Sequence, residues 1–393
     1  MTSANAARAP DGAAAPRVVI LHNRYRIEGG EERSVELQVA ALRRAGIPHR
    51  LLQRSSAAAS RPGAAVALVR GGEEPGEVER AVRDLRAGVV HAHNLHPLLG
   101  PRALAAAREA GARVVLHLHN VRLFCAIGIA FRDGADCHRC RGRRRLPGLL
   151  LNCRGSISEA TAYAAGLALH HPALLEAVDR FVAPSRHAVA QLVYLGLPRD
   201  RIETLAHYLP DDAFAERSLA DRGRFGLIAA RLAPEKGIET AIEAAAATRV
   251  PLKVAGEGPL EPVLRERIAA LRAPVELLGR VGAAEIHRLR KSAAFAVLPS
   301  LYHEFSPFSA LEAMAAGTPV VASRAGGLPE LVGEERCVPR GNASALAEAL
   351  DHLWRDPDRR RAEGDALIAR AREGFGEKRF VRDLHDLYER LGA

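Results

Sequence analysis

Aromatic side chains and lysine are both scarce in this sequence. Aromatic residues make up 4% of the 393 residues, and this argues against a protein that binds nucleic acid by stacking bases on aromatic rings. Lysine occurs only four times, so the formal net charge of +10 comes almost entirely from arginine. Such a charge fits two interpretations: the codon bias of a GC-rich genome, or attraction to phosphate in nucleotides or on an anionic membrane face.

Long apolar runs are missing as well. No run approaches the ~18 residues of a membrane-spanning helix. The first sixteen residues, MTSANAARAPDGAAAP, lack the basic start and the apolar core of a signal peptide. We therefore expect residues 1–16 to form a disordered tail on a cytoplasmic protein. The apolar content of 48% is enough for two ordinary domains with full-sized cores.

Short β-branched runs alternate with helical patterns in both halves of the chain. The expected strands are 17–23, 89–94, 113–120 and 180–185, then 225–232, 252–258, 275–281, 295–300 and 319–323. Continuous apolar strands alternating with helices are typical of doubly wound parallel α/β sheets covered on both faces. The alternation of strands and helices is interrupted at 206–223, and we place the domain junction there. Ligands of such sheets bind at the carboxyl ends of the strands, so functional motifs should follow strands directly.

Two glutamates flank the start of the helix expected after the strand FAVLPS. In SPFSALEAMAAG, Ser306 suits the N-cap and Pro307 suits the first helical position. Free amides near Phe308, together with the helix dipole, favour an anion such as a diphosphate. Glu304 and Glu312 could then accept hydrogen bonds from the hydroxyls of an attached sugar and ribose. The alternative is that both glutamates only stabilise the helix dipole.

A cationic loop follows the strand GLIAA in the second half. ARLAPEKG places Arg231 and Lys236 on one loop, where a forked guanidinium and a point charge suit a diphosphate. On its own this pair could be a surface ion cluster. The glycine-rich turn GEGPLEP, which also joins a strand to a helix, makes a nucleotide cleft the preferred interpretation.

The order of these motifs resembles a known enzyme family. ARLAPEKGIETAIEA, VAGEGP, LLGRV and PSLYHEFSPFSALEAMAAGTPVVASRAGGLPELV are similar to the second half of retaining GT-B-fold glycosyltransferases of family 4, the "glycosyl transferases group 1" type. The resemblance extends over residues 17–390 and is most specific at 227–335. It implies transfer of a hexosyl group from a nucleotide-diphosphate sugar, a UDP- or GDP-sugar above all, to a hydroxyl acceptor. It also implies a retained anomeric configuration and no metal or other cofactor required for catalysis.

The resemblance further implies a GT-B architecture, with two Rossmann-like domains facing each other across a cleft. After the tail 1–16 would come an acceptor-binding domain at 17–208 with a cysteine-bearing insertion at 122–155. A donor-binding domain at 209–375 and a C-terminal helix at 376–393 would follow. The sequence of this last helix is amphipathic, and the helix could pack on either domain or cross back to the first. The acceptor would be a lipid, a glycan or a small molecule.

Site residues can be carried over position by position. Arg231 and Lys236 would hold the diphosphate, Glu304 would bind sugar hydroxyls and Glu312 the ribose, while backbone groups near Arg280 would contact the base. The implied catalytic residues are His119, Arg231, Lys236 and Glu304, and the implied donor-binding residues are Gly29, Gly30, Gly256, Arg280, Val281, Phe305, Ser306, Pro307, Phe308 and Glu312. Many relatives have glycine where this chain has Ser306, a departure that affects the choice of donor sugar.

The first half contributes fewer signals. Gly29 and Gly30 open a helix and allow close approach of a phosphate or sugar. His119 best matches a family histidine at the end of its strand that contacts the donor sugar, and His93 and Arg122 are neighbouring candidates. Most isolated histidines are ordinary core or surface residues, and no carboxylate at ligand spacing supports a metal site here.

Four cysteines fall in the expected insertion at 122–155 of the first domain. Cys125, Cys137, Cys140 and Cys153 are separated by eleven, two and twelve residues, a pattern that fits structural zinc or another cross-link. Free buried thiols are the alternative, and disulfides are disfavoured in a reducing cytoplasm. The neighbouring RCRGRRRLPGLLL fits either a solvated loop or an edge that contacts an anionic membrane or a lipid-linked acceptor, on the inner face of the membrane.

Two other functions are also compatible with the sequence. A phosphorylase or sugar-nucleotide epimerase on the same fold is the first. A zinc-containing nucleic-acid-binding protein is the second, but it leaves the phosphate and hydroxyl contacts of the second half unexplained. We therefore expect no nucleic-acid partner.

Overall fold

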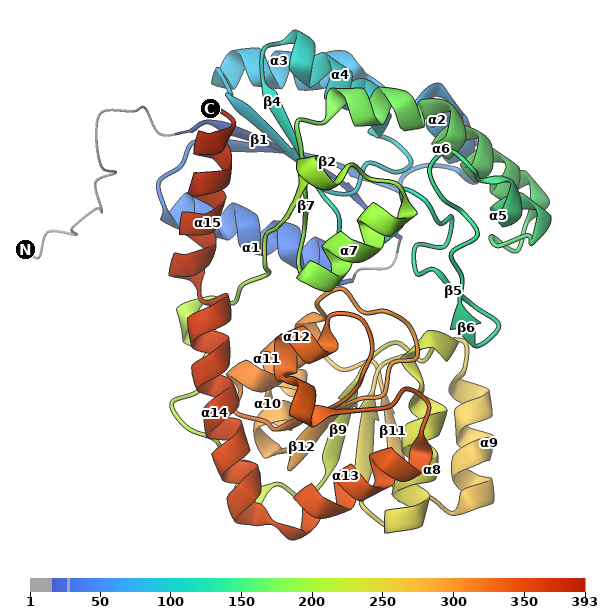
Figure 1. The fold of residues 1–393 in the computed structure, drawn as a ribbon, viewed down its shortest axis with the longest axis vertical. Helices are drawn as coiled ribbons and strands as arrows, with labels where there is room; N and C mark the ends of the chain where they lie inside the picture. Colours follow the sequence, from blue (N-terminus) through green and yellow to red (C-terminus); the bar gives the residue numbers. More distant parts are fainter. Residues whose placement is uncertain (1–15, 27–28, 393) are drawn as a thin grey trace, which may run out of the picture. The chain divides into compact units, whose positions relative to one another are not determined.

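The computed structural model describes residues 16–26 and 29–392 (Figure 1). The tail expected at 1–16 therefore lies, apart from Pro16, outside the described residues. The chain divides into two compact units: one comprises Met1–His117, His170–Arg180 and Val381–Ala393, and the other Leu118–Leu169 and Phe181–Phe380.

Two six-stranded parallel sheets form the framework. The first has the strand order β2-β1-β3-β4-β7-β8 and the second the order β11-β10-β9-β12-β13-β14. The first consists of β1 (Val18–Arg24), β2 (His49–Ser55), β3 (Val89–Ala92), β4 (Arg113–His117), β7 (Arg180–Ala183) and β8 (Ile202–Thr204). The second consists of β9 (Gly226–Ala229), β10 (Leu252–Ala255), β11 (Val275–Gly279), β12 (Phe295–Leu298), β13 (Val320–Ser323) and β14 (Cys337–Val338). The expected doubly wound α/β class is confirmed.

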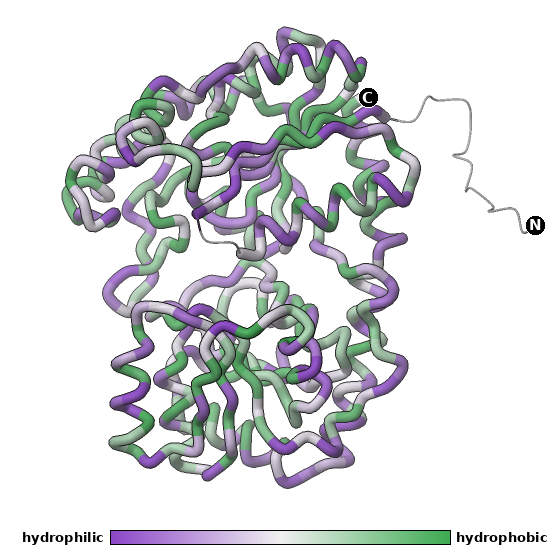
Figure 2. Tube along the Cα trace, turned by 180° about the vertical axis from the view of Figure 1, so that it is seen from behind, coloured by the Kyte–Doolittle hydropathy of each residue, from purple (hydrophilic) through white to green (hydrophobic). Residues whose placement is uncertain are grey.

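All nine expected strands form, because each supplies a short run of apolar residues that both faces of a sheet can bury. β3 and β12, for example, are buried along their whole length. Strands β2, β8 and β14 were not expected. In β2 only Leu52 is buried, because this strand lies at the edge of its sheet and its polar residues conceal the strand pattern. Figure 2 shows green, hydrophobic stretches of the chain within both units.

Most strands are followed by one or more helices. In the first unit these are α1 (Gly30–Arg44), α2 (Arg61–Arg70), α3 (Pro75–Leu85) and α4 (Gly100–Glu109). In the second unit they are α7 (Arg186–Leu195), α8 (Ile238–Thr248), α9 (Glu261–Leu271), α10 (Ala283–Ser292), α11 (Phe308–Ala315), α12 (Leu328–Val332), α13 (Ala343–Arg355) and α14 (Pro357–Phe375). Helix α8 and strands β9, β10 and β12 share one buried apolar core, which includes Ile228, Ile242, Val254 and Phe295.

The last helix, α15 (Glu377–Arg390), has the expected amphipathic pattern, with Phe380, Leu384 and Leu387 buried. Its residues from Val381 onward belong to the first unit. There the Tyr388 hydroxyl lies 2.8 Å from Nδ1 of His91 on β3. The return of the C-terminal helix to the first sheet is thus observed.

The cysteine-bearing segment contains little regular structure. A two-stranded antiparallel hairpin, β5 (Phe131–Arg132) and β6 (Ala135–Asp136), is followed by α5 (Leu146–Leu150) and α6 (Ile157–Ala177). Among the described residues, no helix combines the length and the apolarity needed to cross a membrane. Arg145 departs from the expected basic edge: it is buried and donates to the Leu123 carbonyl at 2.8 Å, so this arginine supports the fold of the segment.

Candidate active site

The loop between β12 and α11 is held in place by hydrogen bonds to two of its backbone carbonyls. Gly327 N–H donates to the Glu304 carbonyl at 2.7 Å, and Ser185 Oγ donates to the Phe305 carbonyl at 2.6 Å. Gly326 has φ +65°, and a Cβ there would lie 2.2 Å from the Glu304 carbonyl oxygen. Glycine is therefore required at 326 for the chain to approach Glu304 this closely.

Helix α11 begins one residue later than the sequence suggested. Its N-cap is Pro307, with φ −73° and ψ 129°, so the prediction of Ser306 as N-cap is wrong. The physical reason is that Pro307 adopts an extended ψ, and helical dihedrals start only at Phe308. The N–H groups of Ala310 and Leu311 donate to the Pro307 carbonyl at 3.1 and 3.3 Å. No backbone carbonyl among the described residues accepts from the N–H of Phe308 or Ser309, which keeps this end suited to an anion.

A buried ion pair lies at the centre of the site. Lys236 Nζ is 2.7 Å from Glu304 Oε1 and 3.2 Å from the Tyr302 hydroxyl. Tyr302 donates to Glu304 Oε2 at 2.7 Å, and Ser300 Oγ donates to Glu304 Oε1 at 2.8 Å. Glu304 is only 5% exposed, so its charge depends on these three partners for stabilisation.

The protonation states of this network follow from its charges. Burial alone would raise the pKa of the Glu304 carboxyl, but the Lys236 charge and three hydrogen bonds lower it. Burial alone would lower the pKa of the Lys236 ammonium, but the Glu304 charge raises it overall. Burial raises the pKa of the Tyr302 phenol. At neutral pH the network therefore contains an ammonium, a carboxylate and a protonated phenol, and the ammonium retains one N–H for a further acceptor.

Arg231 lies on the same loop as Lys236, next to a glycine-rich turn. Its Nη2 atom is 2.7 Å from Glu235 Oε1, and its side chain is 58% exposed, so it is accessible to a ligand. Gly256 has φ +148°, and a Cβ there would lie 1.9 Å from the Ala230 carbonyl oxygen. The loop that carries Arg231 and the glycine-rich turn at Gly256, which the sequence analysis both assigned to the nucleotide cleft, thus pack directly against each other.

The remaining predicted donor contacts are spread over neighbouring elements. Glu312 on α11 forms an ion pair with Arg290 on α10, so one of its oxygens already has a partner. Arg280 follows β11 and is exposed, and Val281 is half-buried. Gly29 is the N-cap of α1, and its N–H donates to Glu32 Oε2 at 2.8 Å. Gly29 and Gly30 belong to the first unit, whereas the other predicted donor residues belong to the second.

His119 is placed by a second histidine that the sequence did not indicate. The His119 and His207 rings stack with centroids 5.5 Å apart, and Nδ1 of His207 lies 3.0 Å from the Ser306 carbonyl oxygen. His207 also stacks on Phe308 at 4.5 Å. Burial lowers the pKa of His207 to about 4, although its contact with Ser306 acts in the opposite direction. His207 is therefore neutral near pH 7 and connects His119 to the start of α11.

Four residues of the site were missed from sequence: Ser300, Tyr302, His207 and Arg290. Ser300 and Tyr302 alternate with Glu304, and this spacing is a local signal that could have been used. His207 and Arg290 are distant in sequence from their partners, and no local pattern marks them.

A separate row of buried histidines lies in the first unit. The ring of His91 on β3 stacks at 5.0 Å on that of His93, which directly follows β3, and His93 stacks on His117 of β4 at 5.2 Å. His22 of β1 contacts His93 edge-on at 6.3 Å. Ring nitrogens of His91, His93 and His117 lie within 4.8 Å of one another. Of these four histidines, the sequence indicated only His93 as a candidate for contact with a ligand.

These histidines predict that stability falls between pH 7.5 and pH 5.5. Burial lowers the pKa of His22 to about 4 and that of His91 to about 3. Below pH 6.5 the unfolded chain binds a proton at each position that the folded chain does not. Their stabilising contribution is thus complete above pH 6.5 and is lost as the pH falls towards 4. At pH 5.5 each histidine should cost about 1.4 kcal/mol.

Urea unfolding at the two pH values measures this loss. The variant His91→Gln should reduce the difference between the two free energies of unfolding by about 1.4 kcal/mol. Equal free energies of unfolding at pH 7.5 and 5.5 in the unsubstituted protein would contradict the assignment of neutral buried histidines.

Comparison with known proteins places this site within a family. The family model "Glycosyl transferase 4-like domain" matches residues 29–206, and "Glycosyl transferases group 1" matches residues 224–356. Together they include most of the chain, and the second match contains Arg231, Lys236, Glu304 and Glu312.

Curated relatives match over shorter regions. MMP alpha-(1->4)-mannosyltransferase of Mycolicibacterium hassiacum is 34% identical over 192 residues, 46% of this chain and 46% of the relative. Alpha-D-kanosaminyltransferase of Streptomyces kanamyceticus is 33% identical over 199 residues, 45% of this chain and 51% of the relative. The chain spans about half the length of these relatives.

Solved structures match over nearly the whole chain. Sucrose-phosphate synthase from Thermosynechococcus elongatus has a TM-score of 0.70 at 18% identity, and the match covers 96% of this chain and 99% of that one. Anabaena HepE in complex with UDP and glucose has a TM-score of 0.65 at 17% identity and covers 95% of this chain and 99% of that one. These similarities confirm the GT-B fold expected from the sequence.

Proposed function

Because this chain belongs to the glycosyltransferases of the group 1 and 4-like type, we propose that it transfers a hexosyl group from a nucleotide-diphosphate sugar to a hydroxyl acceptor. The anomeric configuration is retained, and no metal takes part in catalysis. The observation that carries this proposal is the buried ion pair between Lys236 and Glu304, in which Glu304 lies four residues before Phe308, the first residue of α11. It combines a cation for the diphosphate with a carboxylate for sugar hydroxyls beside free helix amides.

The negative charge that develops on the leaving diphosphate determines the roles of the positively charged residues. When the bond between the sugar C1 and the phosphate oxygen breaks, the oxygen keeps the electron pair and the diphosphate gains negative charge. Lys236, Arg231 and the first amides of α11 stabilise that charge, which lowers the barrier because the donors are already oriented. No divalent cation is needed if these groups supply the positive charge.

The acceptor oxygen forms the new bond to C1 on the face that the diphosphate leaves. Because the acceptor attacks C1 directly, no protein nucleophile is required. Its proton passes to the departing phosphate oxygen, so no protein base is required either. Glu304, ionised and held by Tyr302 and Ser300, orients the transferred sugar by accepting hydrogen bonds from its hydroxyls. His119, positioned by its contact with His207, contacts the same sugar. The acceptor class and contact with an anionic membrane stay predictions of the sequence.

Nucleotide binding tests the role of Arg231. We expect one nucleoside diphosphate among UDP, GDP, ADP, dTDP and CDP to raise the melting temperature selectively. Arg231→Ala should weaken its binding roughly tenfold or more, since a charge-assisted hydrogen bond contributes about 1.5–3 kcal/mol.

Arg265→Ala is the matched control for this experiment. Arg265 pairs with Glu261 four residues away and is 60% exposed, as Arg231 pairs with Glu235 and is 58% exposed. The control should bind the nucleotide as the unsubstituted protein does. Equal losses in both variants, or no nucleotide effect at all, would count against the proposed donor site.

A further inference from the structure

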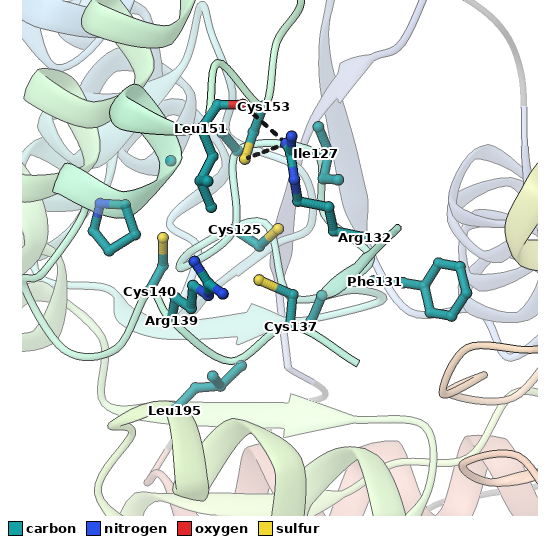
Figure 3. A pocket seen from close by; sticks show the side chains of 14 residues that line it. Cys125, Ile127, Phe131, Arg132, Cys137, Arg139, Cys140, Leu151, Cys153 and Leu195 are labelled. Carbon is teal, nitrogen blue, oxygen red and sulfur yellow. Dashed lines mark hydrogen bonds between the residues drawn. The ribbon is translucent and has the colours of Figure 1, made fainter. Parts of the chain in front are cut away.

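Four of the five cysteines line a single pocket (Figure 3). Cys125 lies in the loop after β4, Cys137 directly follows the β5–β6 hairpin, and Cys140 and Cys153 flank α5. Two backbone hydrogen bonds hold this arrangement: Cys137 N–H donates to the Ala130 carbonyl at 2.7 Å, and Cys153 N–H donates to the Gly148 carbonyl at 3.0 Å. All four thiols are free and partly buried.

The pocket offers sulfur and almost nothing else as a ligand. Its other lining residues are Ala126, Ile127, Ala130, Phe131, Arg132, Arg139, Pro147, Gly148, Leu151 and Leu195. None of them is a histidine or a carboxylate. An apolar lining excludes water, and a sulfur-only ligand set selects a soft or borderline cation such as zinc over calcium or magnesium.

We propose that Cys125, Cys137, Cys140 and Cys153 bind one zinc ion as four thiolates, in a closed structural site separate from the donor site. The separation of two residues between Cys137 and Cys140 is the spacing found in zinc knuckles and ribbons, and the flanking cysteines complete a four-coordinate set. With all four positions taken by protein, the ion has no open position for a substrate, so its role is structural.

Charge balance supports four thiolates at this place. Zinc with four thiolates carries a net charge of −2, and two arginines, Arg132 and Arg139, line the same pocket. Arg132 Nη1 already donates to Cys153 Sγ at 3.7 Å, as Figure 3 shows. Binding releases the thiol protons, so affinity should rise with pH.

Burial raises the pKa of Cys140 and of Cys153, and a bound zinc ion would deprotonate them outright. The histidines of the first unit, rather than these cysteines, have ligand atoms already within 4.8 Å of one another. Zinc binding must therefore draw the four sulfur atoms inward by side-chain rotation.

The site would also stabilise a contact next to Glu304. Asp136, the residue before Cys137, accepts from both terminal nitrogens of Arg340, at 3.0 and 2.9 Å. The same carboxylate lies 3.0 Å from Nε2 of His303, which precedes Glu304. An ion that fixes Cys137 therefore also fixes the position of this carboxylate.

Metal analysis of the whole protein tests the proposal. Protein purified without chelators should contain about one zinc ion per chain, because structural zinc sites retain their metal through purification. Alkylation before reduction should find no disulfide among the four cysteines. Zinc well below one equivalent after growth in zinc-supplemented medium, or a disulfide between any two of the four, overturns the proposal.

Two variants locate the ion. Cys137→Ser/Cys140→Ser should lose the zinc, whereas Cys337→Ser should keep it. Cys337 is buried elsewhere, on β14, where its Sγ donates to the Gly333 carbonyl at 3.4 Å. Zinc retained by the double variant overturns the cysteine site and points to the histidines instead. If the double variant does not fold, cobalt exchanged into the unsubstituted protein decides. Thiolate-to-cobalt charge-transfer bands are expected, and a spectrum without them contradicts sulfur ligation.

Discussion

Replacing Lys236 with methionine should lower the free energy of unfolding by about 3–5 kcal/mol, because it leaves a buried carboxylate without its counter-charge. Glu304 is 5% exposed, and Lys236 Nζ is its only cationic contact among the described hydrogen bonds and ion pairs. The same change removes a positive charge from the proposed diphosphate site. We therefore expect sugar transfer to fall at least ~10²–10³-fold. Chemical denaturation and initial rates measure the two effects.

Two further variants separate stability from catalysis. Lys236→Met/Glu304→Gln removes both charges and should recover much of the lost stability, since replacing a whole buried pair costs far less than breaking it. It should not recover activity. Lys253→Met removes a lysine from an exposed pair with Glu276 and should change stability by about 0–1 kcal/mol. Near-normal transfer by Lys236→Met would remove this residue from the proposed mechanism.

Gly326→Ala should have the second largest effect. A Cβ at this position would lie 2.2 Å from the Glu304 carbonyl oxygen and 2.6 Å from its nitrogen. Both atoms are backbone, so the loop must move, at a cost of about 2–4 kcal/mol from overpacking and left-handed strain. A displacement of about 1 Å at Glu304 should lower the transfer rate roughly 10²-fold.

Gly46→Ala distinguishes the clash from the backbone strain. Gly46 has φ +68°, close to the +65° of Gly326, but a Cβ there meets no atom within 4 Å. This control should cost about 1–2 kcal/mol, the penalty of a left-handed residue alone, and should leave transfer unchanged. Similar losses of stability and rate in both variants would show that the approach to Glu304 is not what requires glycine.

The sequence predicted the strands and the motifs that follow them, because both depend on local patterns. Apolar runs marked nine strands, and Arg231, Lys236 and Glu304 were identified from their positions directly after strands. Lys236 and Glu304 then proved to be hydrogen-bonded to each other. The polar edge strand β2 was missed because it buries only one residue.

Long-range partners were beyond what local patterns can show. His207 lies 99 residues before Ser306 in the chain, yet it contacts the Ser306 carbonyl and stacks on Phe308. Arg290 reaches Glu312 from a different helix. Such contacts depend on how elements pack, and neither residue type nor spacing marks them in advance. The start of α11 was misplaced by one residue because Ser306 and Pro307 both satisfy common rules for a helix start.

The most direct test of the account is donor cleavage followed by NMR. The protein would be incubated, without added divalent cation, with UDP-, GDP-, ADP- and dTDP-linked hexoses and a mixture of hydroxyl acceptors. We expect one donor to release its nucleoside diphosphate and to give a product with the anomeric configuration of the donor. An inverted anomer, release of a sugar 1-phosphate, or the same product yield from Lys236→Met would contradict the proposed transfer.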